Sequence, residues 1–170
     1  MGLQLLLDAP DRIAAAAIIS SGAKIGDARG WSERADLVRA AGTSALVDGS
    51  VRRWFAPGFV EGDPATAAAL LHSLQGADRF SYAAVCAALA NFDVRDRLGE
   101  IRQPLLVATG EYDQATPISL GEEIAAGVTN GQFVTIEQCA HLPSAEQPAA
   151  VAELLIEFFG SAVQQRGRLP

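Results

Sequence analysis

Residues 104–143 read PLLVATGEYDQATPISLGEEIAAGVTNGQFVTIEQCAHLP, and their pattern indicates the fold class. It holds two short apolar runs, 104–109 and 132–137, each bounded by turn residues and each typical of a buried strand. Between them, the sequence predicts a helix after Pro117, with an apolar face formed by Leu120, Ile124 and Val128. A strand, a helix and a second strand imply a right-handed crossover and therefore a parallel sheet.

The segments on either side extend this pattern. Residues 13–20 (IAAAAIIS) fit a third buried strand, with an alanine-rich helix as the alternative. The strand is favoured by the glycines that close the run, Gly22, Gly26 and Gly30. Residues 2–7 have no N-cap and resemble the last turns of a helix that Pro10 stops. We expect a final helix to begin after Pro148 and to stop at Gly160.

The block from 31 to 98 carries helical patterns and no strand pattern. Asp63 before Pro64 is typical of a helix start, and Asp78 is a candidate N-cap for another helix. One helix face, ended by Pro57, is formed by Val47, Val51, Trp54 and Phe55. A block of about 70 residues is too long for a crossover between two strands. We therefore expect an inserted helical cap on the rim of the sheet.

The predicted fold class is α/β, with three parallel strands, flanking helices and this cap. The division that follows is a partial core in 1–21 and 99–160, a cap in 22–98, and a tail or linker in 161–170. A length of 170 residues suits one such unit.

Composition excludes several classes of protein. Apolar residues make up 49% of the chain, which rules out a disordered chain. Thirteen basic and 20 acidic residues give a net charge of −7, which argues against nucleic-acid binding. Two cysteines are too few for a disulfide framework or a zinc cluster. We expect a cytoplasmic protein, because the low cysteine count suggests a reducing compartment and because neither a signal peptide nor an apolar run of membrane-spanning length is evident.

Two residues follow strands at the edge where α/β sheets bind ligands. Asp113 follows the run 104–109, and His141 follows the run 132–137. A buried carboxylate can fix the tautomer of an imidazole and stabilise its charged form, as in a nucleophile–histidine–aspartate relay. Taken singly, Asp113 suits a cap for the next helix and His141 suits a structural role. The order aspartate then histidine, each after a strand, favours catalysis.

At this point the sequence resembles the C-terminal half of the α/β-hydrolase family, and more narrowly the 3-oxoadipate enol-lactonases. The resemblance rests on six segments. They are Ala9 to Ile13, Ala23 to Gly26, Arg53 to Phe59 (RWFAPGF), Tyr82 to Leu89 (YAAVCAAL), Gly110 to Pro117, and Ala140-His141-Leu142 with Glu146-Gln147-Pro148. Pro143-Ser144-Ala145 departs from the serine–asparagine pair that often follows the histidine, which leaves substrate preference open.

The resemblance implies catalytic roles for Asp113, as the acid, and His141, as the general base. It also implies a small carboxylated lactone as substrate, hydrolysed to 3-oxoadipate in the β-ketoadipate pathway of aromatic-compound catabolism, without a metal or organic cofactor. Arg53 and Trp54 are the candidate substrate-binding residues from the cap. The alternatives are that Trp54 belongs to the cap core and that Arg52 and Arg53 are solvated.

The family's Gly-x-Ser-x-Gly nucleophile motif does not occur in these 170 residues. We therefore expect the serine and its oxyanion-hole amides to lie before Met1, and this chain alone to be at best weakly active. Cys139 is an alternative nucleophile, although a buried thiol at a strand end is usually inert. His72 lies among leucines and is expected to be structural.

The strand expected in 13–20 and the tail from 161 indicate possible partners. The strand in 13–20 should lie beside the missing nucleophile strand, so its edge should bind the missing half of the hydrolase or a second copy. The resemblance includes fusions to a carboxymuconolactone decarboxylase, so the tail from 161 is a free end or a linker. Alternative functions are another capped hydrolase, such as an esterase or a cofactor-free haloperoxidase, and an inert fragment or binding module.

Overall fold

The computed structural model describes the backbone of residues 1–166 and the side chains of residues 1–162. Its sheet has three parallel strands in the order β1 (Ala16–Ile19), β2 (Leu105–Gly110) and β3 (Gly131–Ile136). All three predicted strands are confirmed, and the alanine-rich helix is wrong for 16–19. The central strand β2 is buried along its whole length, as expected for apolar residues covered on both faces.

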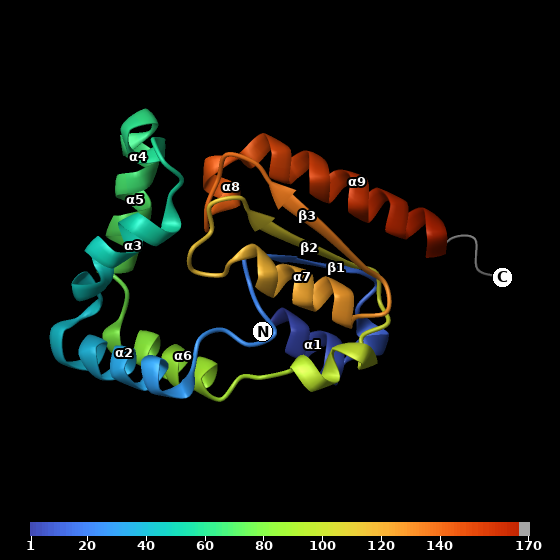
Figure 1. Ribbon diagram of the computed structural model, residues 1–170, viewed down its shortest axis with the longest axis horizontal. Coiled ribbons are helices and arrows are strands. Elements are labelled where there is room, and N and C mark those ends of the chain that lie inside the picture. Colours follow the sequence, from blue (N-terminus) through green and yellow to red (C-terminus); the bar gives the residue numbers. More distant parts are fainter. Residues whose placement is uncertain (167–170) are drawn as a thin grey trace.

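Helices cover both faces of the sheet (Figure 1). On one face, α1 (Gly2–Asp8) and α7 (Ile118–Gly127) pack with the 3₁₀ helix η3 (Arg95–Glu100) on a core that contains Leu6, Leu105 and Ile124. On the other face, α9 (Pro148–Arg166) packs Val151 against Ala108 of β2. Two short helices, η1 (Pro10–Arg12) and α8 (Pro143–Glu146), complete this part of the chain.

The cap consists of helices that lie between β1 and β2 in the sequence. They are α2 (Ala28–Ala41), the 3₁₀ helix η2 (Thr43–Leu46), α3 (Val47–Trp54), α4 (Phe59–Gly62), α5 (Pro64–Gln75) and α6 (Arg79–Ala90). The predicted N-caps are confirmed, because Asp63 accepts a hydrogen bond from the backbone N–H of Thr66 and Asp78 accepts one from Ser81. The strands point toward the cap, which stands beside their carboxyl ends (Figure 1).

The last helix differs from its predicted end. It continues through Gly160 to Arg166, so the predicted stop at Gly160 is wrong. No atom lies within 4 Å of a Cβ placed on Gly160, so this glycine sits at an open position of the helix and does not end it. A glycine inside a helix costs only about 1 kcal/mol relative to alanine. The remainder of the predicted tail, 167–170, lies outside the described residues.

Candidate active site

Two loops follow β2 and β3 and lie against each other at the carboxyl ends of the strands. The backbone N–H of Tyr112 donates to the carbonyl oxygen of Cys139 at 2.9 Å. Gly110 makes this approach possible, because a Cβ at that position would overlap the carbonyl oxygen of Ala140. The glycine that ends β2 therefore brings the two predicted site residues within reach of each other.

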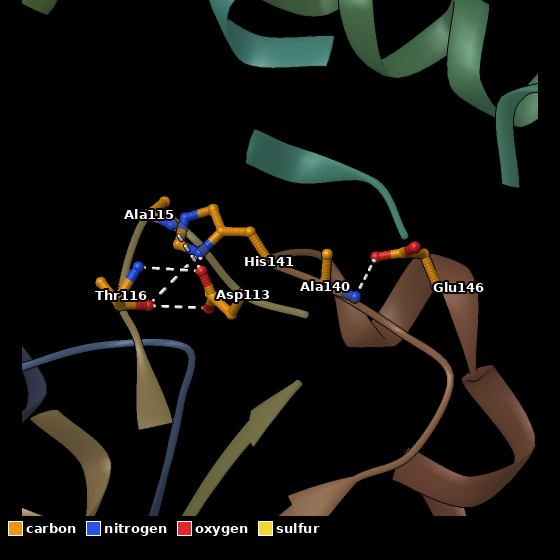
Figure 2. A network of polar contacts seen from close by, with 6 residues as sticks. All are labelled: Asp113, Ala115, Thr116, Ala140, His141 and Glu146. Carbon is orange, nitrogen blue, oxygen red and sulfur yellow. Dashed lines mark hydrogen bonds and ion pairs between the residues drawn. The ribbon is translucent and has the colours of Figure 1, made fainter. Parts of the chain in front are cut away.

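Asp113 in the first loop and His141 in the second form a direct contact (Figure 2). The Nδ1 atom of His141 lies 3.0 Å from Oδ2 of Asp113. The side chain of Asp113 is fully buried, whereas 23% of the His141 side chain is exposed. The expectation that these two side chains lie side by side is confirmed. A buried carboxylate that orients a partly exposed imidazole suits proton transfer on the exposed side of the ring.

The Asp113 carboxylate accepts hydrogen bonds on both oxygens. Oδ1 accepts from the backbone N–H groups of Ala115 and Thr116 at 2.9 and 2.8 Å, and Oδ2 accepts from the Thr116 hydroxyl at 2.8 Å. Pro117 is the N-cap position of α7, so the suggestion that Asp113 caps this helix is wrong. Burial alone raises the pKa of Asp113, but hydrogen bonds from His141 and Thr116 outweigh it and hold the pKa below its usual value.

Glu146 joins the cap to the loop that carries His141. Its Oε2 accepts from the backbone N–H of Ala56 at 2.7 Å, and its Oε1 accepts from that of Ala140 at 2.9 Å. The backbone N–H of His141 also donates to the carbonyl oxygen of Trp54 at 3.1 Å. The cap segment after α3 is thus fixed against the histidine loop. Sequence reasoning did not assign Glu146 a role of its own, because its two partners are backbone groups that only the fold brings together.

A cavity of about 470 Å³ opens between the cap and the sheet. His141 and Thr116 line it from the core side, and Arg53 and Trp54 line it from α3. The other cap residues in its wall include Asp27, Trp31, Arg34 and Tyr82. Asp113 lies behind His141 and does not line the cavity. The cavity therefore combines an imidazole with two arginines.

The two arginines of the cavity have no carboxylate within ion-pair distance among the described residues. Arg34 donates twice to the hydroxyl of Tyr82, at 3.0 and 2.9 Å, and lies over the rings of Trp31 and Tyr82. Arg53 donates to the carbonyl oxygen of Gly49 at 3.0 Å. Burial and the neighbouring charge of Arg34 lower the pKa of Arg53, although a guanidinium remains charged at neutral pH. This positive region suits an anionic group of a ligand.

The predicted substrate-binding residues both lie at the cavity. Arg53 is half-buried there, while its neighbour Arg52 is exposed and does not line it. Trp54 lines the cavity and also packs against the cap cluster of Val38, Leu46 and Leu74. The alternative that Trp54 belongs to the cap core is therefore confirmed, and the residue borders the cavity as well. Trp31 and Arg34 also line the cavity and were not predicted from the sequence. Their i, i+3 spacing, which places both on one helix face, could have indicated them.

The alternative nucleophile has the wrong environment. Cys139 is fully buried, and its thiol donates to the carbonyl oxygen of Ile136. Burial, together with the charges of Glu146 and Asp113, raises the pKa of Cys139 to about 12, so the thiolate is scarce at neutral pH. His72 is exposed on α5 and does not line the cavity.

Over the described residues, His141 lacks a serine partner, and no cluster of metal ligands forms. Ser20, at the end of β1, lines the cavity, yet within this part of the chain no serine hydroxyl forms a hydrogen bond with His141. Nor does the described part contain a group of three or more histidine, cysteine or acidic side chains placed to hold a metal ion. None of its helices combines the length and the apolar character needed to cross a bilayer.

Comparisons with known proteins agree on the type of fold. A family model described as the alpha/beta hydrolase family matches residues 1–154. The 3-oxoadipate enol-lactonase 2 of Acinetobacter baylyi is 34% identical over 149 residues, which cover 88% of this chain and 55% of that protein. A second enol-lactonase of the same organism is 35% identical over 147 residues. The chain thus spans about half the length of these curated relatives.

Solved structures give the same result. The enol-lactonase from Burkholderia xenovorans superposes with a TM-score of 0.89 at 28% identity, over 94% of this chain and 61% of that one. A hydrolase from Pseudomonas aeruginosa superposes with a TM-score of 0.88 at 32% identity, over 94% of this chain and 60% of that one. The three parallel strands and their helices therefore correspond to about 60% of a solved hydrolase.

Proposed function

The chain belongs to the alpha/beta hydrolase family, and we propose that it carries the acid–base residues and the substrate cap of an enol-lactone hydrolase. One observation carries this proposal. Asp113 and His141 form a hydrogen-bonded pair at 3.0 Å, and His141 lines a cavity whose cap side holds two arginines. This is the arrangement that serine hydrolysis of a small, negatively charged ester requires.

In the proposed reaction, His141 moves the proton and Asp113 stabilises the imidazolium. A serine hydroxyl loses its proton to Nε2 of His141 and attacks the lactone carbonyl, so that the ring C–O bond breaks. The imidazolium returns the proton to the leaving oxygen. Water then attacks the acyl-serine with His141 again as base, which releases the open-chain acid and the serine.

The arginines indicate the substrate class. Arg34 and Arg53 would hold a carboxylate at the cap end of the cavity, while Trp54 contacts the apolar part of the ligand. Because 3-oxoadipate enol-lactone carries such a carboxylate, it is the substrate that we propose. The protein would then act in the β-ketoadipate pathway of aromatic-compound catabolism, in the cytoplasm and without a cofactor.

We further propose that the serine comes from a segment outside these 170 residues that pairs with the edge of β1. β1 is entirely apolar, which is typical of an interior strand of a parallel sheet. Its backbone N–H groups at Ala16 and Ser20 bond to the side of β2, so those of Ala17 and Ile19 point to the other side. Among the described residues, β1 pairs with β2 alone. Self-association through this edge is the competing outcome.

The test mixes this chain with a polypeptide that carries the family's Gly-x-Ser-x-Gly strand and turn, and follows hydrolysis of a substrate panel. We expect the mixture to hydrolyse 3-oxoadipate enol-lactone faster than neutral lactones or nitrophenyl esters. Arg34→Met and Arg53→Met should each raise the KM for the charged lactone about 10- to 100-fold, because hydrogen bonds to charged groups are worth about 1.5–3 kcal/mol. The KM for neutral esters should not change.

Other results would redirect the proposal. Preference for neutral esters would indicate an esterase or a haloperoxidase-like enzyme with the same fold. A folded complex that binds 3-oxoadipate but does not hydrolyse any substrate would indicate a carboxylate-binding module. The cavity favours this second candidate specifically, because its two arginines and exposed imidazole can bind an anion without the serine.

A further inference from the structure

The hydroxyl of Thr116 lies beside the Asp113–His141 pair, within hydrogen-bond distance of both residues (Figure 2). Its Oγ1 atom is 2.8 Å from Oδ2 of Asp113 and 3.4 Å from Nδ1 of His141. Only 2% of Thr116 is exposed, and its backbone N–H holds the other oxygen of Asp113. Because the backbone N–H of Thr116 is bonded to Asp113, the Thr116 side chain is held beside that carboxylate. Its hydroxyl therefore has two neighbours, Asp113 and His141.

The number of available hydrogens determines which atom donates in each hydrogen bond of the Thr116 hydroxyl. An ionised carboxylate can only accept, and a threonine hydroxyl has a single hydrogen to donate. The hydrogen goes to Asp113, which is the charged acceptor and the nearer one. The Thr116 oxygen therefore presents a lone pair to Nδ1 of His141.

The Nδ1 atom of His141 then faces two acceptors, Oδ2 of Asp113 at 3.0 Å and Oγ1 of Thr116 at 3.4 Å. An unprotonated Nδ1 would place its own lone pair against both oxygens. A proton on Nδ1 satisfies both of them, and the neutral ring then keeps its lone pair on Nε2. Within the described part of the chain, Nε2 has no hydrogen-bond partner.

We propose that Thr116 is a positioning residue that fixes His141 in the Nδ1–H tautomer, so that Nε2 stands ready to accept a proton. It acts by committing its own hydrogen to Asp113 and by sharing the Nδ1 hydrogen with it. The inference rests on the proposed function only for its consequence in catalysis, because the tautomer is a property of this chain alone.

The test is a ¹H–¹⁵N correlation spectrum of the chain labelled at its histidines, at a pH where both rings are neutral. The sequence has two histidines, and the exposed His72 serves as an internal reference. Wild type is compared with Thr116→Val, which removes the hydroxyl at nearly constant shape, and with Thr116→Ser, which keeps it. Thr116→Ala replaces the valine variant if the latter does not melt cooperatively.

We expect Nδ1–H to dominate in wild type and in Thr116→Ser. In Thr116→Val the ratio of Nδ1–H to Nε2–H should fall about tenfold, the effect of one lost hydrogen bond, while His72 does not change. Mainly Nε2–H in wild type, or an unchanged ratio in a folded Thr116→Val, would overturn the proposal. If the tautomer behaves as expected and the mixed chains hydrolyse nothing, the proposed function fails and this inference stands.

Discussion

The carboxyl ends of β2 and β3 contrast with the edge of β1. Where β2 and β3 end, Asp113 accepts hydrogen bonds on both oxygens and Glu146 uses both of its own. Where β1 ends, Ser20 has a left-handed φ of 46°, and its buried hydroxyl lacks a hydrogen-bond partner among the described residues. A positive φ on a residue other than glycine carries strain that surrounding structure usually stabilises.

The contrast shows that one part of the site is complete within this chain, whereas the edge of β1 suits a further strand. The contact between Asp113 and His141 is built from residues of this chain alone, so it should form in the isolated chain. The β1 half has apolar strand residues and outward-pointing backbone groups that suit a neighbouring strand. β3 differs from β1, because it contains two exposed polar residues, Gln132 and Thr135, which suit the edge of a sheet.

The largest expected effect comes from breaking the acid–base pair. In the mixture with the serine-bearing segment, Asp113→Asn should reduce kcat for lactone hydrolysis by roughly 10⁴-fold, because the amide no longer stabilises the imidazolium. His141→Ala should reduce it at least as much, since the members of such a relay act as a unit. Steady-state kinetics measure both. His72→Ala is the control and should retain wild-type kcat.

The next effect concerns the contact between the two loops. Gly110→Ala should lower the free energy of unfolding by about 3 kcal/mol, because its Cβ would overlap the backbone of the histidine loop. Urea titration measures the loss. Gly160→Ala is the control, since a Cβ there meets no atom within 4 Å and alanine favours the helix. Equal stability of Gly110→Ala and wild type would show that the loops do not depend on this glycine.

Sequence predicted the three strands, a helical cap and the N-caps Asp63 and Asp78, because apolar periodicity and capping residues act over a few positions. The order aspartate then histidine, each after a strand, also predicted that Asp113 and His141 meet, as they do. Arg53 and Trp54 were candidates from the family resemblance, and both line the cavity. Arg34 and Glu146 escaped it. Arg34 lies near Arg53, and Glu146 binds the backbone N–H groups of Ala56 and Ala140. Only the packing of the cap brings these groups together.

A smaller effect is expected where the cap meets the core. Glu146→Gln should lower the free energy of unfolding by about 1–2 kcal/mol, because an amide has one acceptor oxygen for the two backbone N–H groups. Thermal unfolding monitors the loss. Glu153→Gln, on the exposed face of α9, should leave stability unchanged. Equal effects of the two variants would contradict a stabilising role for the contacts of Glu146 with the cap and the histidine loop.

The smallest effect tests the β1 edge itself. Ala17→Pro removes a backbone N–H that points away from β2, so self-association of the chain should weaken about fivefold, as expected for one lost hydrogen bond. Analytical ultracentrifugation over a range of concentrations measures the association. Ala17→Val keeps the N–H and should associate as wild type does. A chain that stays monomeric at every concentration would contradict self-association and leave the edge to the serine-bearing segment.

Whether His141 acts as the general base can be measured by the rate at which a fluorophosphonate probe labels the serine of the added segment. We expect labelling to accelerate at least about 10³-fold when this chain is present, because in the proposed mechanism His141 removes the serine proton. The same segment mixed with His141→Ala should label at its basal rate. Equal labelling with wild type and His141→Ala, in complexes shown to form, would contradict the claim that this chain supplies the general base.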